Sequence, residues 1–284
     1  MGASAPSGPG DVLRSAAPVF AFTCYTLETA TGVVAAAVDA HRPVILLVAD
    51  SVFAAPSGPS LVRALRAVAD PAPVPVFVQL DHCSDLGRIA AAVDAGAHAV
   101  MADGSTLPYE DNVAFTRRAV ELVADRGVCV EAELGRIEGD EDVDRAAAVS
   151  EAMTDPGQAV DFVARTGVDC LAVAVGNVHG SYRGEVRLDL DRLADVAAAA
   201  GVPLALHGAS GVPDAVLADA VRCGAAKVNV NTELRAAAFD VLARRVGPLT
   251  GGLRTASLVA ELEDAARTVA AGKFAVGAGA PGTG

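Results

Sequence analysis

Short apolar runs recur along the chain at regular intervals, and turn-forming residues bound each of them. The runs cover residues 18–24, 43–49, 75–81, 99–104, 128–135, 170–176, 203–210 and 226–232. The segments between them are rich in alanine, leucine, valine and arginine, and their apolar positions have helical spacing, as in PSLVRALRAVAD. Apolar strands that alternate with helices predict a parallel sheet that helices cover on its exposed faces.

Eight strand–helix units in 284 residues predict an α/β protein built as a single (β/α)8 TIM barrel. An open, doubly wound sheet is the alternative. It would normally carry a glycine-rich phosphate turn after its first strand, and the segment FTCYTLETA is not of that kind. We expect a flexible lead-in at residues 1–14, the barrel domain at 15–274, and a disordered tail at 275–284.

Composition narrows the classes of partner and compartment. The net charge of −13 argues against a nucleic-acid or anionic-membrane partner, because like charges repel. The five cysteines contain no CxxC pair, which indicates reduced thiols, and we find neither a signal peptide nor an apolar run of membrane-spanning length. We therefore expect a cytoplasmic protein.

Polar residues follow the predicted strands where each strand ends. Active groups of (β/α)8 barrels lie at the carboxyl ends of the strands, so these side chains should meet at one cavity mouth. The residues concerned are Asp81, His82, Asp103, Glu131, Glu133, Asn177, His179, His207, Ser210, Asn229, Asn231 and Thr232.

Three of the five histidines belong to this set. His82, His179 and His207 follow strands three, six and seven, whereas His41 and His98 precede strands and belong to the opposite end of the barrel. A lone histidine is usually structural, but three at one mouth, with an open coordination position, form a pattern typical of catalytic zinc.

Several motifs in order then resemble one family. They are LDH at 80–82, MADGSTLPYEDN at 101–112, VEAELG at 130–135, EGDED at 138–142, LAVAVGNVHGSY at 171–182, LHGASG at 206–211 and KVNVNTEL at 227–234. This series resembles the class II, metal-dependent ketose-bisphosphate aldolases, and within them the tagatose-bisphosphate aldolase branch.

The resemblance implies roles for individual residues. His82, His179 and His207 match the zinc ligands, Asp81 matches the acid/base at the substrate hydroxyl, and Glu141 matches a second proton-transfer residue. Glu133 matches a position that can approach the metal, and Asp103 is either a partner of a ligand histidine or a turn residue. The segments that hold the ketose phosphate or contact substrate contain Gly180, Gly208, Ala209, Ser210, Asn229, Asn231 and Thr232.

The resemblance also implies partners. They are one Zn²⁺ per subunit, a monovalent cation beside the phosphate, dihydroxyacetone phosphate or a close analogue as donor, and a homodimer or homotetramer.

The chain departs from the family pattern at the ends of strands one and two. Thr23 stands where the family has asparagine, and Asp50 and Ser51 follow strand two. Gln79 replaces a histidine before the LDH motif, and Thr106 replaces another. We expect Thr23, Asp50 and Ser51 on the acceptor side and an acceptor other than glyceraldehyde 3-phosphate. Asp50 would repel a second phosphate if it faced the cavity; the alternative is that it points outward and caps a turn.

Two other functions compete with this prediction. A Schiff-base aldolase would need a lysine; Lys273 falls near the predicted tail, and Lys227 opens strand eight, at the wrong end for the mouth. A non-catalytic barrel that binds sugar phosphates would have lost Asp81 or a zinc histidine, and neither is lost.

Overall fold

A computed structural model describes residues 8–15, 17–137, 152–180, 182, 186–246 and 255–278. Eight parallel strands close into a barrel in which β1 pairs with β8, and every predicted apolar run contains or overlaps one strand. The strands are β1 (Val19–Thr23), β2 (Val44–Ala49), β3 (Val76–Cys83), β4 (Ala99–Ala102), β5 (Cys129–Leu134), β6 (Cys170–Val173), β7 (Leu204–Leu206) and β8 (Ala225–Val230). The predicted (β/α)8 barrel is confirmed.

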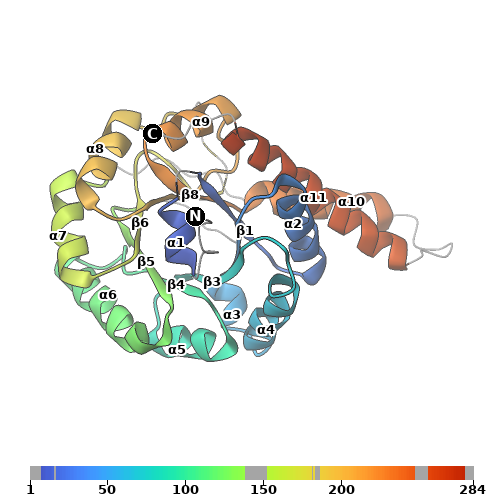
Figure 1. Ribbon diagram of the computed structural model, residues 1–284, viewed down its shortest axis with the longest axis horizontal. Helices are drawn as coiled ribbons and strands as arrows, with labels where there is room; N and C mark the ends of the chain where they lie inside the picture. The colour runs from blue at the N-terminus through green and yellow to red at the C-terminus, as the bar shows by residue number, and fades with distance from the viewer. Residues whose placement is uncertain are drawn as a thin grey trace, which may run out of the picture.

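Helices surround the strands as an outer ring (Figure 1). The long helices are α2 (Leu27–Ala40), α4 (Gly58–Ala69), α5 (Leu86–Ala95), α6 (Tyr109–Val123), α7 (Pro156–Thr166), α8 (Leu190–Ala200), α9 (Asp214–Arg222), α10 (Thr232–Val246) and α11 (Thr255–Ala278). Three short helices are α1 (Pro9–Leu13), α3 (Asp50–Phe53) and the 3-10 helix η1 (Ala124–Arg126).

Local sequence sets several helix ends. The carboxylates of Asp85, Asp155 and Asp189 each accept a backbone N–H at the start of α5, α7 and α8. The same helices end at Gly96, Gly167 and Gly201, which adopt the left-handed conformation that stops a helix.

The strands bury both faces, which explains their continuous apolar sequence. Along β2, Ile45 and Leu47 point into the barrel, whereas Val44, Leu46 and Val48 pack against the surrounding helices. Side chains that alternate between two apolar environments leave no polar position within the strand.

The chain before β1 closes the bottom of the barrel. Helix α1 lies across the centre of the ring of strands (Figure 1), and Val12 and Leu13 join the inner cluster with Ile45 and Phe77. The predicted flexible lead-in is therefore wrong for residues 9–13. A helix of five residues is too short to be recognised from its sequence pattern. It is stabilised by the burial of Val12 and Leu13 in the barrel interior, which exists only when the barrel is closed.

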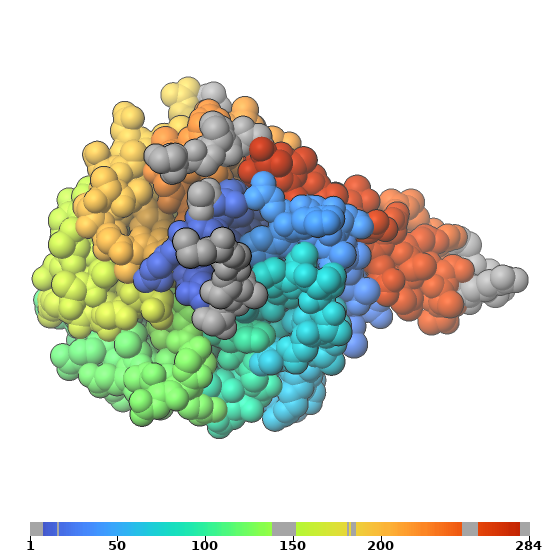
Figure 2. Space-filling model, viewed as in Figure 1, coloured from blue at the N-terminus to red at the C-terminus, as the bar shows by residue number. Residues whose placement is uncertain are grey.

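The carboxyl-terminal helix is longer than predicted. Helix α11 continues to Ala278, so the tail predicted from residue 275 is wrong as far as residue 278. It packs closely on α2, where a Cβ atom at Gly32 would lie 2.1 Å from the carbonyl oxygen of Glu263. Helices α10 and α11 also extend together beyond the round outline of the barrel (Figure 2). Among the described helices, none is long and apolar enough to cross a membrane.

Candidate active site

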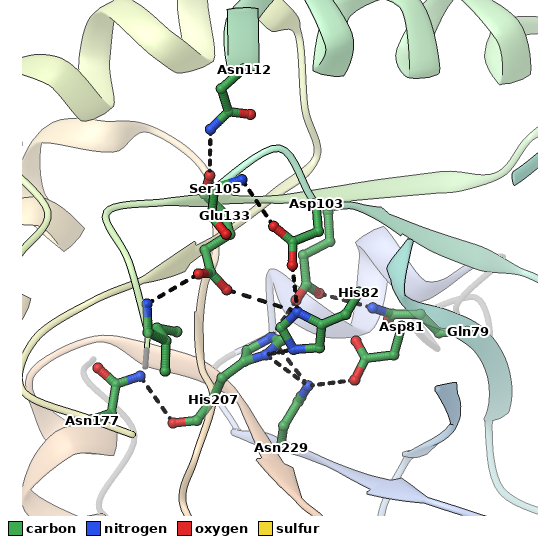
Figure 3. Close-up of polar contacts among 12 residues, drawn as sticks. Gln79, Asp81, His82, Asp103, Ser105, Asn112, Glu133, Asn177, His207 and Asn229 are labelled. Atoms are coloured by element: carbon green, nitrogen blue, oxygen red, sulfur yellow. Dashed lines mark hydrogen bonds and ion pairs between the residues drawn. The ribbon is translucent and has the colours of Figure 1, made fainter. Parts of the chain in front are cut away.

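The end of β3 brings two neighbouring ionisable side chains to the same place. Adjacent residues of a regular strand point to opposite faces. Here the pairing of β3 with β4 shifts between Leu80 and Cys83, and His82 has a left-handed φ of 52°. Asp81 and His82 therefore both reach the polar cluster at the barrel mouth (Figure 3).

The three predicted zinc ligands come together above the strands. One nitrogen from each of His82, His179 and His207 lies within 4.8 Å of the others, and His82 Nε2 is 2.9 Å from His207 Nδ1. Burial, and then the charges of the other two histidines, lower the pKa of His179 well below its usual value, which favours the neutral ring that a metal requires. Three convergent imidazoles fit one zinc ion.

Two carboxylates orient the rings of His82 and His207 by contacting the ring nitrogens that point away from the centre. His82 Nδ1 is 2.8 Å from Asp103 Oδ2, and His207 Nε2 is 2.8 Å from Glu131 Oε1. Each contact occupies the outer nitrogen and leaves the inner one, His82 Nε2 or His207 Nδ1, toward the centre. Of the two roles considered for Asp103, the structure places it beside a predicted ligand. Although burial alone would raise its pKa, the hydrogen bond and charge of His82 hold that pKa below its usual value.

Glu131 in turn forms an ion pair inside the barrel. Its Oε2 is 2.6 Å from Lys227 Nζ and accepts a hydrogen bond of 3.2 Å from Gln79 Nε2. The side chains of Lys227 and Glu131 are 0% and 2% exposed, so each charge depends on the other for compensation. From its place at the start of strand eight, Lys227 was expected at the end of the barrel away from the mouth, and no partner was expected for Glu131. The structure joins them directly beneath His207.

Asp81 lies beside the histidines as a buried acid. Its Oδ2 is 3.5 Å from Asn229 Nδ2, and its Oδ1 has no hydrogen-bond partner among the described residues. Burial raises the pKa of this carboxyl, and the charge of His82 opposes that rise. The Asn229 amide is also 3.1 Å from His207 Nε2, so it links the acid to a predicted ligand. An unpartnered oxygen at this position can accept a proton from a substrate hydroxyl.

Glu133 lies near the same centre, on β5. Its Oε2 is 4.0 Å from His82 Nδ1, and its Oε1 accepts a hydrogen bond from the Ile137 amide at 3.3 Å. Burial, followed by the charge of Asp103, raises the pKa of Glu133 to about 8. The contact is with the outer nitrogen of His82, and an approach of Glu133 to a metal stays a prediction. Glu141 lies outside the described residues.

The segments predicted to hold phosphate meet after β6, β7 and β8. Gly208 has a φ of 62°, and a Cβ there would lie 2.0 Å from the carbonyl oxygen of Val178, so only glycine allows this approach. The Tyr182 hydroxyl donates to the Gly208 carbonyl at 2.9 Å, and the backbone N–H of Asn231 donates to Ser210 Oγ at 3.2 Å. The remaining predicted positions in these segments are Gly180, Ala209 and Thr232.

Helix α11 supports this region from the outside. Lys273 Nζ lies 2.8 Å from Glu233 Oε2, and Glu233 Oε1 accepts the Gly211 amide at 2.9 Å. Lys273, which the sequence suggested to be near the tail, is therefore a buried residue that fixes the loop after β7.

The residues predicted for the acceptor side separate into two groups. Thr23 and Ser51 line a cavity of about 460 Å³. Asp50 instead receives two hydrogen bonds of 2.7 Å from the Arg88 guanidinium. This pair compensates the carboxylate charge, so repulsion of a second phosphate by Asp50 loses its basis.

The chain is similar in sequence to known aldolases. The family model described as "Fructose-bisphosphate aldolase class-II" matches residues 13–279. The D-tagatose-1,6-bisphosphate aldolase subunit GatY of Klebsiella oxytoca is 41% identical over 222 residues, 78% of each chain. A probable fructose-bisphosphate aldolase of Bacillus subtilis (strain 168) is 40% identical over 215 residues, 75% of each chain.

Solved structures agree with these sequence matches. The YdjI aldolase from Escherichia coli K12 has a TM-score of 0.83 at 33% identity, covering 96% of this chain and 95% of its own. A putative fructose-1,6-bisphosphate aldolase from Coccidioides immitis has a TM-score of 0.86 at 31% identity, covering 95% and 94%.

Proposed function

This chain belongs to the class II fructose-bisphosphate aldolase family and is a carbon–carbon lyase, and on that premise we propose its chemistry in detail. It is a zinc aldolase that reversibly cleaves a ketose (bis)phosphate, with dihydroxyacetone phosphate or a close analogue as the donor. The observation that carries the proposal is the convergence of His82, His179 and His207 beside the buried acid Asp81.

Each residue has a defined part in this reaction. Zinc held by the three histidines would act as a Lewis acid toward the negative charge that develops on the donor oxygen. Asp81 accepts the proton of the hydroxyl next to the cleaved bond and returns it in the condensation direction. Asp103 and Glu131 hold two of the imidazole rings in position, and Asn229 aligns Asp81.

The donor phosphate belongs to the segments after β6, β7 and β8. The family resemblance supports this placement, since Gly180, Gly208 and Ser210 match the phosphate-holding segments, and Gly208 brings two of these segments together by its close approach to Val178. Backbone N–H groups in such glycine-containing loops can bind an anion. Asn231 and Thr232 begin the next segment at the start of α10. The family resemblance supports a monovalent cation beside the phosphate, a homodimer or homotetramer, and a cytoplasmic location, and we include these in the proposal.

The acceptor aldehyde differs from glyceraldehyde 3-phosphate. Thr23 supports this part of the proposal, because it stands where the family has an asparagine side chain and because it borders the cavity beside β1. Ser51 borders the same cavity, whereas Asp50 takes no part, since Arg88 compensates its charge.

Metal content and condensation activity test the proposal together. We expect one zinc per chain, loss of condensation with dihydroxyacetone phosphate after chelation, and recovery when zinc is returned. His207→Ala should lose both the metal and the activity. His41→Asn is the control, because His41 is an exposed histidine in the left-handed conformation that asparagine tolerates.

Two results would favour the competing functions. Activity that survives chelation, with borohydride trapping at Lys227, would indicate a Schiff base. A zinc-loaded protein that binds dihydroxyacetone phosphate but never exchanges its donor proton with solvent would be a sugar-phosphate-binding barrel.

A further inference from the structure

A cavity of about 460 Å³ lies beside the barrel mouth, between β1 and helices α2, α3, α10 and α11. Its volume lies within the usual range for small-molecule sites. Residues that carry hydroxyl groups, including Thr23 and Tyr25, line it on the barrel side. Leu234, Ala238 and Leu242 recur every four residues along α10 and form an apolar wall opposite. The cavity therefore has a polar inner end and an apolar body.

The end of β8 places one asparagine at the reaction centre and another beside this cavity. The Asn229 amide lies 3.5 Å from Asp81 Oδ2 and 3.1 Å from His207 Nε2. Two residues later, Asn231 Nδ2 donates to the Tyr25 hydroxyl at 3.2 Å, and Tyr25 lines the cavity. Two residues of extended chain span about 7 Å. The centre and the cavity wall therefore meet neighbouring residues of one segment, Asn229 and Asn231.

The cavity offers a second phosphate only one compensating charge among its described lining residues. Arg235 is the one cationic side chain among the described lining residues. A phosphate dianion placed against the leucines of α10 would lose hydration that a single guanidinium cannot replace. Asp50, which precedes the lining residue Ser51 in the chain, is paired with Arg88, so its charge is compensated.

We propose that this cavity receives the acceptor half of the substrate and selects an aldehyde that carries a short apolar chain in place of a phosphate. The inference rests on the aldolase activity proposed above. In condensation, the donor carbon beside the ketone loses one proton and bonds to the aldehyde carbon, whose oxygen gains one proton, so no further reactant is consumed.

A series of aldehydes tests the selection. With the zinc-loaded protein and dihydroxyacetone phosphate, kcat/KM is measured for propanal, butanal, pentanal and glyceraldehyde 3-phosphate. Burial of each added methylene group should raise kcat/KM by about fourfold. Glyceraldehyde 3-phosphate should give a lower value than any of the three unsubstituted aldehydes.

A variant of the cavity wall tests the location. Ala238→Leu places a larger side chain in the cavity, so its loss of kcat/KM should grow from propanal to pentanal. Ala243→Leu makes the same change at an exposed position of α10 and should leave the whole series as in the unmodified protein.

The donor half-reaction separates this inference from the proposed function. Exchange of the donor proton with solvent needs no acceptor, so it reports on the aldolase chemistry alone. If donor-proton exchange is intact, two results would contradict the proposal that the apolar cavity binds the acceptor. One is a kcat/KM that does not change with aldehyde chain length. The other is an equal loss of kcat/KM for all aldehydes in Ala238→Leu. A preference for glyceraldehyde 3-phosphate that Arg235→Met abolishes would also overturn that proposal and assign an anionic acceptor. Without exchange in the unmodified protein, the aldolase proposal fails, and this inference fails with it.

Discussion

The two ends of the barrel differ in the polarity of their buried side chains. At the carboxyl ends of the strands, buried carboxylates, imidazoles and amides contact one another around His82, His207 and Asp81. At the other end, α1 seals an interior of aliphatic and aromatic side chains that includes Leu13, Ile45 and Phe77. The contrast indicates that reactivity and stability depend on different residues.

One ion pair lies between these two regions. Lys227 and Glu131 are fully enclosed by the strands, yet Glu131 touches His207, a predicted zinc ligand. Variants at the top should therefore change chemistry alone, variants at the bottom should change stability alone, and variants of this pair should change both.

Asp81→Asn tests the top and should have the largest effect. Asparagine keeps the size of the side chain but cannot accept the substrate proton, so kcat should fall by about 10²–10⁴-fold. Zinc content and the thermal unfolding midpoint should stay close to those of the unmodified protein. A near-normal kcat would remove Asp81 from proton transfer.

Lys227→Met tests the connection between the two ends. It leaves Glu131 buried without a cation, which should lower the free energy of unfolding by about 3–5 kcal/mol. Zinc affinity, measured by competition with a chromophoric chelator, should fall by about 10–100-fold, because the carboxylate that orients His207 is disturbed.

The double variant Lys227→Met/Glu131→Gln is the control for this pair. It removes both charges, so most of the lost stability should return while zinc affinity stays low. Zinc affinity that returns together with stability would mean that the ion pair serves the fold only.

Leu13→Ala tests the bottom. Truncation of a side chain that is 3% exposed should lower the free energy of unfolding by about 2–5 kcal/mol, measured by chemical denaturation. The kcat of the folded protein should not change. Leu122→Ala, at a leucine 45% exposed on α6, is the matched control and should alter stability by about 0.5 kcal/mol or less. A loss of kcat in Leu13→Ala would break the separation between the two ends.

His98, the histidine before β4, should give the smallest effect. Burial, and then the charge of Arg66, lower its pKa from the usual 6.5 to about 4, and its Nδ1 accepts the Val78 amide at 3.0 Å. Between pH 6.5 and 4 the unfolded chain therefore binds a proton that the folded chain does not. Stability should fall as the pH falls through this window, by about 1–2 kcal/mol after allowance for partial solvent screening.

His98→Gln is the comparison for this pH effect, because glutamine does not titrate. Denaturation midpoints between pH 7.5 and 4.5 should fall less steeply in the variant. If the plots of denaturation midpoint against pH were parallel for the two proteins, His98 would not contribute to the pH dependence of stability.

The strands and the mouth could be predicted because both depend on local pattern. Apolar runs mark the strands, and parallel strands bring their carboxyl ends to one place, so residues as far apart as His82 and His207 could be assigned to one site. The same reasoning could not find that Glu131 faces Lys227 across the barrel, because inward partners depend on the register of eight strands.

Contacts between helices also could not be predicted from the sequence. Asp50 on α3 meets Arg88 on α5, and nothing near either residue in the chain specifies that pair. The short α1 and the end of α11 were missed for a related reason, since both are held by surfaces that exist only after the barrel has closed.

The packing of α11 has a consequence for synthesis. The Phe274 ring meets those of Phe20 and Phe22 edge-on, with centroids 6.1 and 5.9 Å apart, so the final helix covers the outer face of the first strand. In chain order β1 comes long before α11, so it leaves the ribosome without this aromatic cover. Apolar surface that is exposed during synthesis favours chaperone binding, and we expect such binding until α11 has been made. A ribosome stalled before residue 255 should bind trigger-type chaperones more strongly than the released chain, and equal binding would contradict this order.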